Sequence, residues 1–134
     1  MSYDLMVFEK TAAPKNRKDF MEWYENQTEW SEDHGYDDPA VSSKDLQAWF
    51  MEIKKTFPPM NGPYAPSDEE FDNMEDDSYV TDYSIGKDVI YAAFAWSLAD
   101  EAYETVKKLA KEYAVGFFDV SSDEGEIIFP DGEG

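Results

Sequence analysis

Five short segments of the chain have the length and the apolar pattern of β-strands. Residues 3–8 and 89–96 carry apolar side chains on both sides, which is typical of strands buried on both faces of a sheet. Residues 80–85 alternate between polar and apolar, and residues 117–120 and 126–129 form two short apolar runs near the end of the chain. The two-sided segments are therefore expected at the centre of one sheet, with residues 80–85 and 126–129 at its edges.

Three further segments repeat apolar residues every three or four positions, which is the spacing of one face of an α-helix. A first helix is expected to begin near Asn16, a second near Ser42 and a third near Ser97, because each of these side chains can cap a free backbone amide. The prolines from Pro58 onward end the second helix, and Gly116 releases the chain from the third.

The predicted elements follow the order strand, helix, helix, strand, strand, helix, strand, strand. Gly86 and Lys87 favour a two-residue hairpin turn between the second and third strands. Setting aside the second helix and the last strand leaves βαββαβ, an arrangement in which an antiparallel sheet carries its helices on one face. We therefore predict a single α+β domain over residues 1–134, ferredoxin-like, with an inserted helix and an extra C-terminal strand.

The composition removes several classes of enzyme from consideration. The chain has no cysteine and a single histidine, so it cannot form a disulfide, a cysteine nucleophile or a multi-histidine zinc site of its own. The sequence also lacks the glycine motifs that cradle phosphate. We expect no metal, no cofactor and no enzyme of the common hydrolytic or nucleotide-dependent kinds, while a mechanism based on a pair of carboxylates stays open.

Acidic residues outnumber basic ones by 31 to 11, which gives a formal net charge of -20. Such a surface disfavours nucleic acids and anionic membranes, because both are bound through basic side chains, and it favours basic partners. The simpler alternative is that the charge only keeps the protein in solution. The first ten residues include Asp4 and Glu9 where a signal peptide has basic residues before an apolar stretch, so we expect a cytoplasmic protein.

The charge is concentrated in residues 67–79, a predicted loop between the second helix and the second strand that holds seven acidic residues and no basic one. Phe71 and Met74 stand among these acids as apolar anchors for an interface. We predict that the segment binds a basic protein through Asp68, Glu69, Glu70, Phe71, Asp72, Met74, Glu75, Asp76 and Asp77. Two alternatives stay open: a solvated loop without a partner, and a mimic of DNA that competes for many DNA-binding proteins.

A second candidate site surrounds the single histidine. Trp30, His34 and Tyr36, together with the proline-rich residues 58–66, would form a pocket for a small molecule. His34, which has several carboxylates beside it, would act as a proton shuttle or as one ligand of a hard-cation site. The alternative is a solvated loop histidine, which is favoured because no second histidine or nucleophile stands at a recognisable spacing.

Four stretches of the chain carry a resemblance to known sequences: Tyr3 to Glu9, Phe57 to Pro63, Val80 to Gly86 and Val115 to Val120. The amino-acid sequences of these stretches resemble those of a group of small acidic bacterial proteins of unassigned activity. In size and charge the chain is similar to bacterial immunity proteins, which neutralise a cognate toxin by binding it. This resemblance implies that the basic partner is a toxin, and it assigns no role to any single residue.

Both expected edge strands are poorly suited to pairing with another chain. The strand at residues 80–85 carries Asp82 and Ser84, and the strand at residues 126–129 is short and is followed by Pro130. We therefore expect a monomer, or at most a dimer formed through the uncovered face of the sheet.

Overall fold

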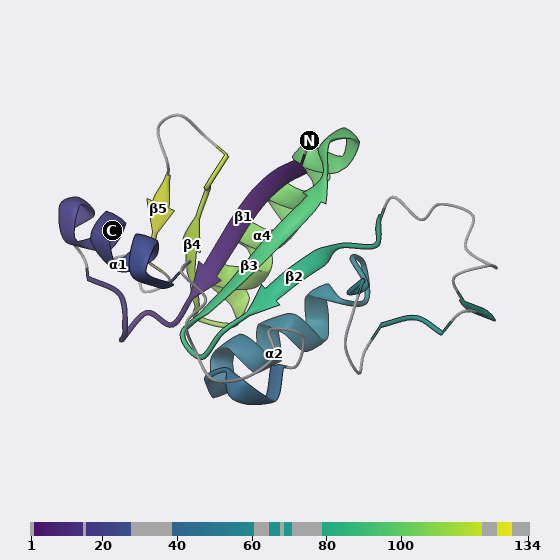
Figure 1. The fold of residues 1–134 in the computed structure, drawn as a ribbon, viewed down its shortest axis with the longest axis horizontal. Coiled ribbons are helices and arrows are strands. Elements are labelled where there is room, and N and C mark those ends of the chain that lie inside the picture. The colour runs from purple at the N-terminus through teal and green to yellow at the C-terminus, as the bar shows by residue number, and fades with distance from the viewer. Residues whose placement is uncertain are drawn as a thin grey trace.

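The structure is a computed structural model, which describes residues 2–14, 16–27, 39–60, 65–67, 69–70, 79–121 and 126–129. Within these residues the chain forms a five-stranded antiparallel sheet in the order β2-β3-β1-β4-β5 (Figure 1). The strands are β1 (Ser2–Phe8), β2 (Asp82–Ile85), β3 (Val89–Ala95), β4 (Gly116–Phe118) and β5 (Ile127–Ile128). The predicted α+β class is confirmed, and the two edge strands are those expected.

β1 lies in the middle of the sheet, antiparallel to β3 on one side and to β4 on the other. Leu5 and Val7 join the larger hydrophobic core on one face, whereas Met6 and Phe8 join the smaller core on the other face. All four side chains are fully buried. A strand that is apolar on both sides requires cover on both faces of its sheet, because each face otherwise leaves apolar area in water.

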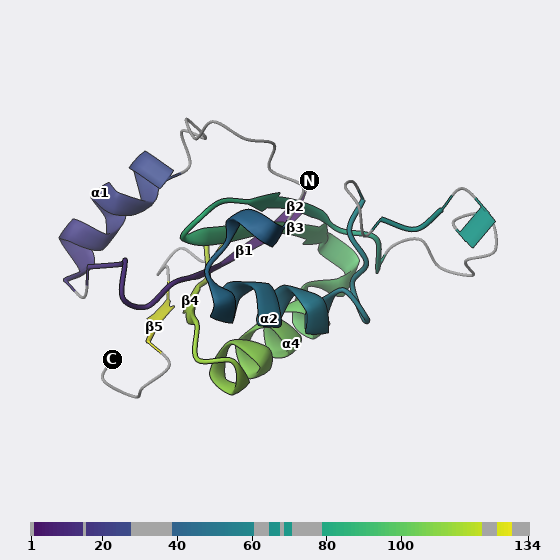
Figure 2. The same cartoon turned by 90° about the horizontal axis from the view of Figure 1, so that it is seen from below.

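α2 (Lys44–Ile53) and α4 (Ala99–Glu112) lie next to each other on one face of the sheet (Figure 2). Their apolar sides bury Trp49, Phe50 and Val106 in the larger core. The ring of Phe57, just beyond α2, packs edge-to-face on Phe94 of β3 with 4.9 Å between centroids. This face therefore holds the main core of the protein.

α1 (Arg17–Gln27) lies on the opposite face of the sheet from α2 and α4 (Figure 2). Phe20 is buried there, with its ring 5.0 Å from that of Phe8 and 5.2 Å from that of Phe118. The first and third helices were expected to share one face of the sheet; instead α2 and α4 share a face, and α1 covers the other. The periodicity of the α1 sequence shows which side of this helix is apolar. Because β1 is apolar on both of its sides, either face of the sheet could receive α1, and the sequence did not indicate which one does.

The remaining helical elements are short. η1 (Pro39–Val41) precedes α2, and η3 (Trp96–Leu98) joins β3 to α4. Among the described residues, no helix combines the length and the apolar character needed to cross a membrane.

The helix starts agree only in part with the expected caps. Asn16 caps α1, since its Oδ1 accepts hydrogen bonds from the backbone amides two and three residues later, at 2.9 and 3.3 Å. Ser43 rather than Ser42 caps α2. Ser97 lies inside η3, and α4 begins two residues later without a side-chain cap.

Ser42 instead fastens α2 to the hairpin between β2 and β3. Its hydroxyl donates a hydrogen bond of 2.7 Å to the carbonyl oxygen of Gly86, and the side chain is buried. The backbone N–H of Gly86 donates to the carbonyl oxygen of Val89 at 2.8 Å, so residues 87–88 form the turn, one position later than expected. The carbonyl of Gly86 is bound by a neighbouring segment, which a sequence pattern local to the hairpin does not reveal.

Candidate functional site

A groove with a volume of about 550 Å³ runs between the second half of α4 and the β4–β5 edge of the sheet. It exists because two helices, each about 10 Å wide, cover roughly four strands spaced about 4.8 Å apart. The sheet has five strands, so β5 extends past α4 on this face. The half-buried side chain of Ile128, on β5, lines the groove.

The groove has an apolar floor and a charged rim. Buried or half-buried side chains of α4 and of the chain beyond it form the floor: Ala110, Val115, Phe117, Ile128 and Phe129. Polar residues of α4 form the rim: Tyr103, Glu104, Lys107, Lys108 and Lys111. Three of the eleven basic residues in a chain of net charge -20 therefore meet at one groove.

The end of α4 shapes one end of this groove. Ala114 has a φ of 59°, in the left-handed region, and the backbone N–H of Val115 donates to the carbonyl oxygen of Ala110 at 3.0 Å. These are the features of a Schellman-type helix end, in which the chain turns back on the last helical turn. Gly116, which was expected to end the helix, lies in β4 instead.

Lys107 is held in place by Tyr103 and Glu126. The Tyr103 hydroxyl donates a hydrogen bond of 2.6 Å to Glu126 Oε1, and Lys107 Nζ donates to the Tyr103 oxygen at 3.1 Å and lies 3.8 Å from Glu126 Oε2. The hydrogen bond to Glu126 raises the pKa of Tyr103, and the hydrogen bond to Tyr103 raises the pKa of Lys107. Lys107 is therefore a positioned cation at neutral pH, and the Tyr103 phenol is neutral.

A second polar cluster lies on the α1 face of the sheet. The Tyr91 hydroxyl donates a hydrogen bond of 2.5 Å to Asp4 Oδ2, and Tyr24 of α1 hydrogen-bonds to Tyr91. Burial and, after it, the neighbouring Asp4 raise the pKa of Tyr91, and burial raises that of Tyr24. Both phenols are therefore donors rather than bases at neutral pH. Within the described residues, no group of three or more His, Cys, Asp or Glu side chains could hold a metal ion.

Most of the residues predicted to bind a ligand or a partner lie outside the described residues. They are Trp30, His34 and Tyr36 of the candidate pocket, and Asp68, Phe71, Asp72, Met74, Glu75, Asp76 and Asp77 of the acidic segment. Glu69 and Glu70 are described, and both are exposed. Ser67 and Glu70 form a capping box: Ser67 Oγ accepts from the Glu70 amide at 3.1 Å, and Glu70 Oε1 accepts from the Ser67 amide at 3.2 Å.

The lysine-rimmed groove was missed at the level of sequence. From the sequence, the lysines of α4 were attributed to the helix dipole, which favours basic residues near the end of a helix. The sequence contains one pattern that could have indicated a groove. It is the row of residues Tyr103, Lys107, Ala110 and Lys111, which are separated by four, three and one positions along the chain. This row runs along the border of the apolar face of α4, where a fifth strand would meet it.

The described residues at the start of the acidic segment lie far from the groove. Residues 65–67 and 69–70 stand far to one end of the long axis, and β5 stands toward the other, in both views (Figure 1 and Figure 2). Comparison with known proteins assigns no role to either region, because no protein-family model, no curated protein and no solved structure matches the chain.

Proposed function

We propose that the protein is an acidic binding protein that blocks a basic partner protein, with residues 67–79 as its contact segment. The observation that carries this proposal is the presence of seven acidic residues and no basic one among those thirteen positions. Like charges at this density repel each other, and a surface rich in Lys and Arg relieves that repulsion and is attracted over a long range.

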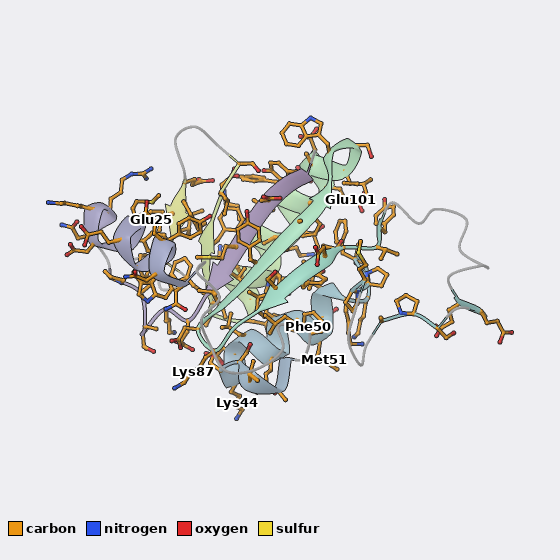
Figure 3. The ribbon with its side chains drawn as sticks, in the orientation of Figure 1. Glu25, Lys44, Phe50, Met51, Lys87 and Glu101 are labelled. Atoms are coloured by element: carbon orange, nitrogen blue, oxygen red, sulfur yellow. The ribbon has the colours of Figure 1, made fainter. Side chains whose placement is uncertain are left out.

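The described ends of the segment support this proposal. Glu69 and Glu70 are exposed, so a partner can reach their carboxylates. After the segment, Tyr79 donates a hydrogen bond of 2.8 Å to Glu101 Oε1 at the start of α4, next to the exposed Asp100. Figure 3 labels Glu101 at the start of α4. Tyr79, the last residue of the segment, is thus joined to an exposed acidic residue of the folded domain.

The most specific form of the proposal is an immunity protein against a bacterial toxin that acts on nucleic acid. A protein that binds nucleic acid needs basic side chains for the phosphates, and those side chains are the targets that clustered carboxylates fit. Phe71 and Met74 supply apolar side chains in the same segment, and interface energy comes mainly from such buried anchors. The protein would act in the cytoplasm as a monomer, which sedimentation at several concentrations tests.

The test starts from capture of the partner and continues with the purified pair. One variant changes Asp68, Glu69, Asp76 and Asp77 to the corresponding amides. A matched control changes Asp19, Glu22, Glu25 and Glu112, which are exposed acids of α1 and α4, in the same way. We expect wild type and control to bind one basic protein and to inhibit its action on nucleic acid, with an association rate that falls as salt is added.

The segment variant should associate at least about tenfold more slowly, because the steering charge is lost. Retention of no basic protein by the wild type, or equal rates and salt dependence for wild type and segment variant, would rule out the proposal. Capture of many DNA-binding proteins that duplex DNA displaces would instead identify a DNA mimic. Binding of a specific metabolite that is lost when His34 is changed to Ala would favour the small-molecule or carboxylate-enzyme alternative.

A further inference from the structure

We propose that the groove between α4 and the β4–β5 edge binds a small amphipathic anion, an apolar chain or ring that ends in a carboxylate. The groove volume of about 550 Å³ falls within the range of about 300–1,000 Å³ that is usual for small-molecule sites. This site uses other residues than the acidic segment and does not depend on the proposed partner.

The apolar part of the ligand is matched by the floor. Val115 and Phe117 are each 1% exposed and Ala110 is 2% exposed, so the floor is made of the packed core itself. Ile128 is only partly buried against the core. An apolar chain in the groove removes this remaining apolar area from water, which is favourable in proportion to the area covered.

The acidic part of the ligand is matched by the lysines. The dipole of α4 accounts for Lys111, which stands in the last turn, but it does not account for Lys107 and Lys108. Lys107 and Lys111 are four residues apart on one side of the helix, where like charges repel each other. Lys107 is partly balanced by Glu126, and Glu104 stands on the rim one turn before Lys108, so the three lysines leave the groove with a net positive charge that a bound carboxylate would neutralise.

The charge at the groove differs in sign from the net charge of the chain. At -20, the protein repels anions at long range and attracts cations. A site for a neutral apolar compound needs no lysine on its rim, and a site for a cation would not have three. The local charge of the groove is therefore opposite to the net charge of the protein, and it is explained by a ligand that carries a negative group.

The probe for this site is dodecanoate, used with the full chain at concentrations where it forms no micelles. Dodecanol and dodecyltrimethylammonium have the same apolar chain with a neutral or a positive head. We expect dodecanoate to shift the backbone amide resonances of residues 103–118 and 126–129, and to bind more tightly than either of the other two. Raising the salt concentration should weaken its binding.

The variant that tests the lysines is Lys108→Gln with Lys111→Gln. A matched control is Lys44→Gln with Lys87→Gln, two exposed lysines outside the groove, which Figure 3 shows pointing away from the molecule at the start of α2 and at the hairpin turn. The groove variant should bind dodecanoate at least about fivefold more weakly, because it loses two charge contacts. The control, which has the same net charge, should bind it like the wild type.

Equal loss of affinity in both lysine variants would show that only the net charge matters, and the proposal would be wrong. It would also be wrong if the cationic probe bound more tightly, or if the resonance shifts lay outside the groove. The amide variant of residues 67–79 keeps the groove intact, so it should bind dodecanoate at least as well as the wild type. The failure of one proposal can therefore be distinguished from the failure of the other.

Discussion

The ring of Phe8 occupies the space that a side chain at Gly116 would need. The two residues face each other in the β1–β4 register, and a Cβ placed on Gly116 would overlap the edge of the ring. Phe8 is fully buried and is itself held by the rings of Phe20 and Phe129, whose centroids lie 5.0 and 5.4 Å away. The glycine therefore makes room for an aromatic ring at the centre of the sheet.

Gly116→Ala should destabilise the protein by roughly 1–3 kcal/mol, because the ring of Phe8 has no free space into which it can move. Urea unfolding measures the change. The double variant Gly116→Ala with Phe8→Leu should lose less than the sum of the two single variants, since the smaller side chain leaves room for the methyl group. A loss below about 0.5 kcal/mol for Gly116→Ala would show that the packing around Phe8 relaxes.

Ala114→Gly should stabilise the protein by about 1 kcal/mol, because Ala114 has a φ of 59°, which glycine adopts without steric cost. The same change at Ala48, inside α2, provides a control of opposite sign. There the added backbone freedom should cost about 1 kcal/mol. The two urea midpoints should therefore move in opposite directions, and a loss of stability in both variants would contradict the assigned helix end.

Alkaline pH should destabilise the protein through Tyr83. Its hydroxyl donates a hydrogen bond of 2.7 Å to the carbonyl oxygen of Phe57, and burial raises its pKa above the ordinary value. The folded state thus holds this proton more tightly than the unfolded chain. The stabilisation is complete below about pH 10, the unfolded-state pKa, and is lost as the pH rises further, by about 1.4 kcal/mol per pH unit.

Urea unfolding between about pH 9 and about pH 11 should show this loss, with a smaller slope in Tyr83→Phe. The variant should also lose about 1 kcal/mol at neutral pH, because the Phe57 carbonyl is left without its donor. Burial also raises the pKa of Tyr3 and Tyr91, so some slope should persist in the variant. Equal slopes in wild type and variant would mean that Tyr83 ionises without unfolding.

Added NaCl should stabilise the protein. A chain of net charge -20 repels itself in the compact state, and at about 1 M salt the screening length falls to about 3 Å. We expect the urea midpoint to rise with NaCl, and to rise less in the variant with four acids of residues 67–79 changed to amides. A midpoint that does not depend on salt would mean that the excess charges lie too far apart to repel.

The sequence was informative for features that depend on residues close together along the chain. The two-sided apolar pattern of β1, the cap at Asn16 and the position of β5 could all be predicted. Features set by contacts between distant segments could not. Ser42 binds the hairpin at Gly86, α1 covers the second face of the sheet, and the groove arises because two helices are narrower than five strands.

The position of β1 also has a consequence for how the chain folds during synthesis. Phe8 pairs with Val89, 81 positions later, and with Gly116, 108 positions later, so both neighbours of this strand emerge from the ribosome long after it does. Such distant pairing slows folding, because large loops must close before any contact forms. Until then a strand that is apolar on both sides stays unpaired, and this interval is when the nascent chain is most exposed to aggregation or to capture by chaperones.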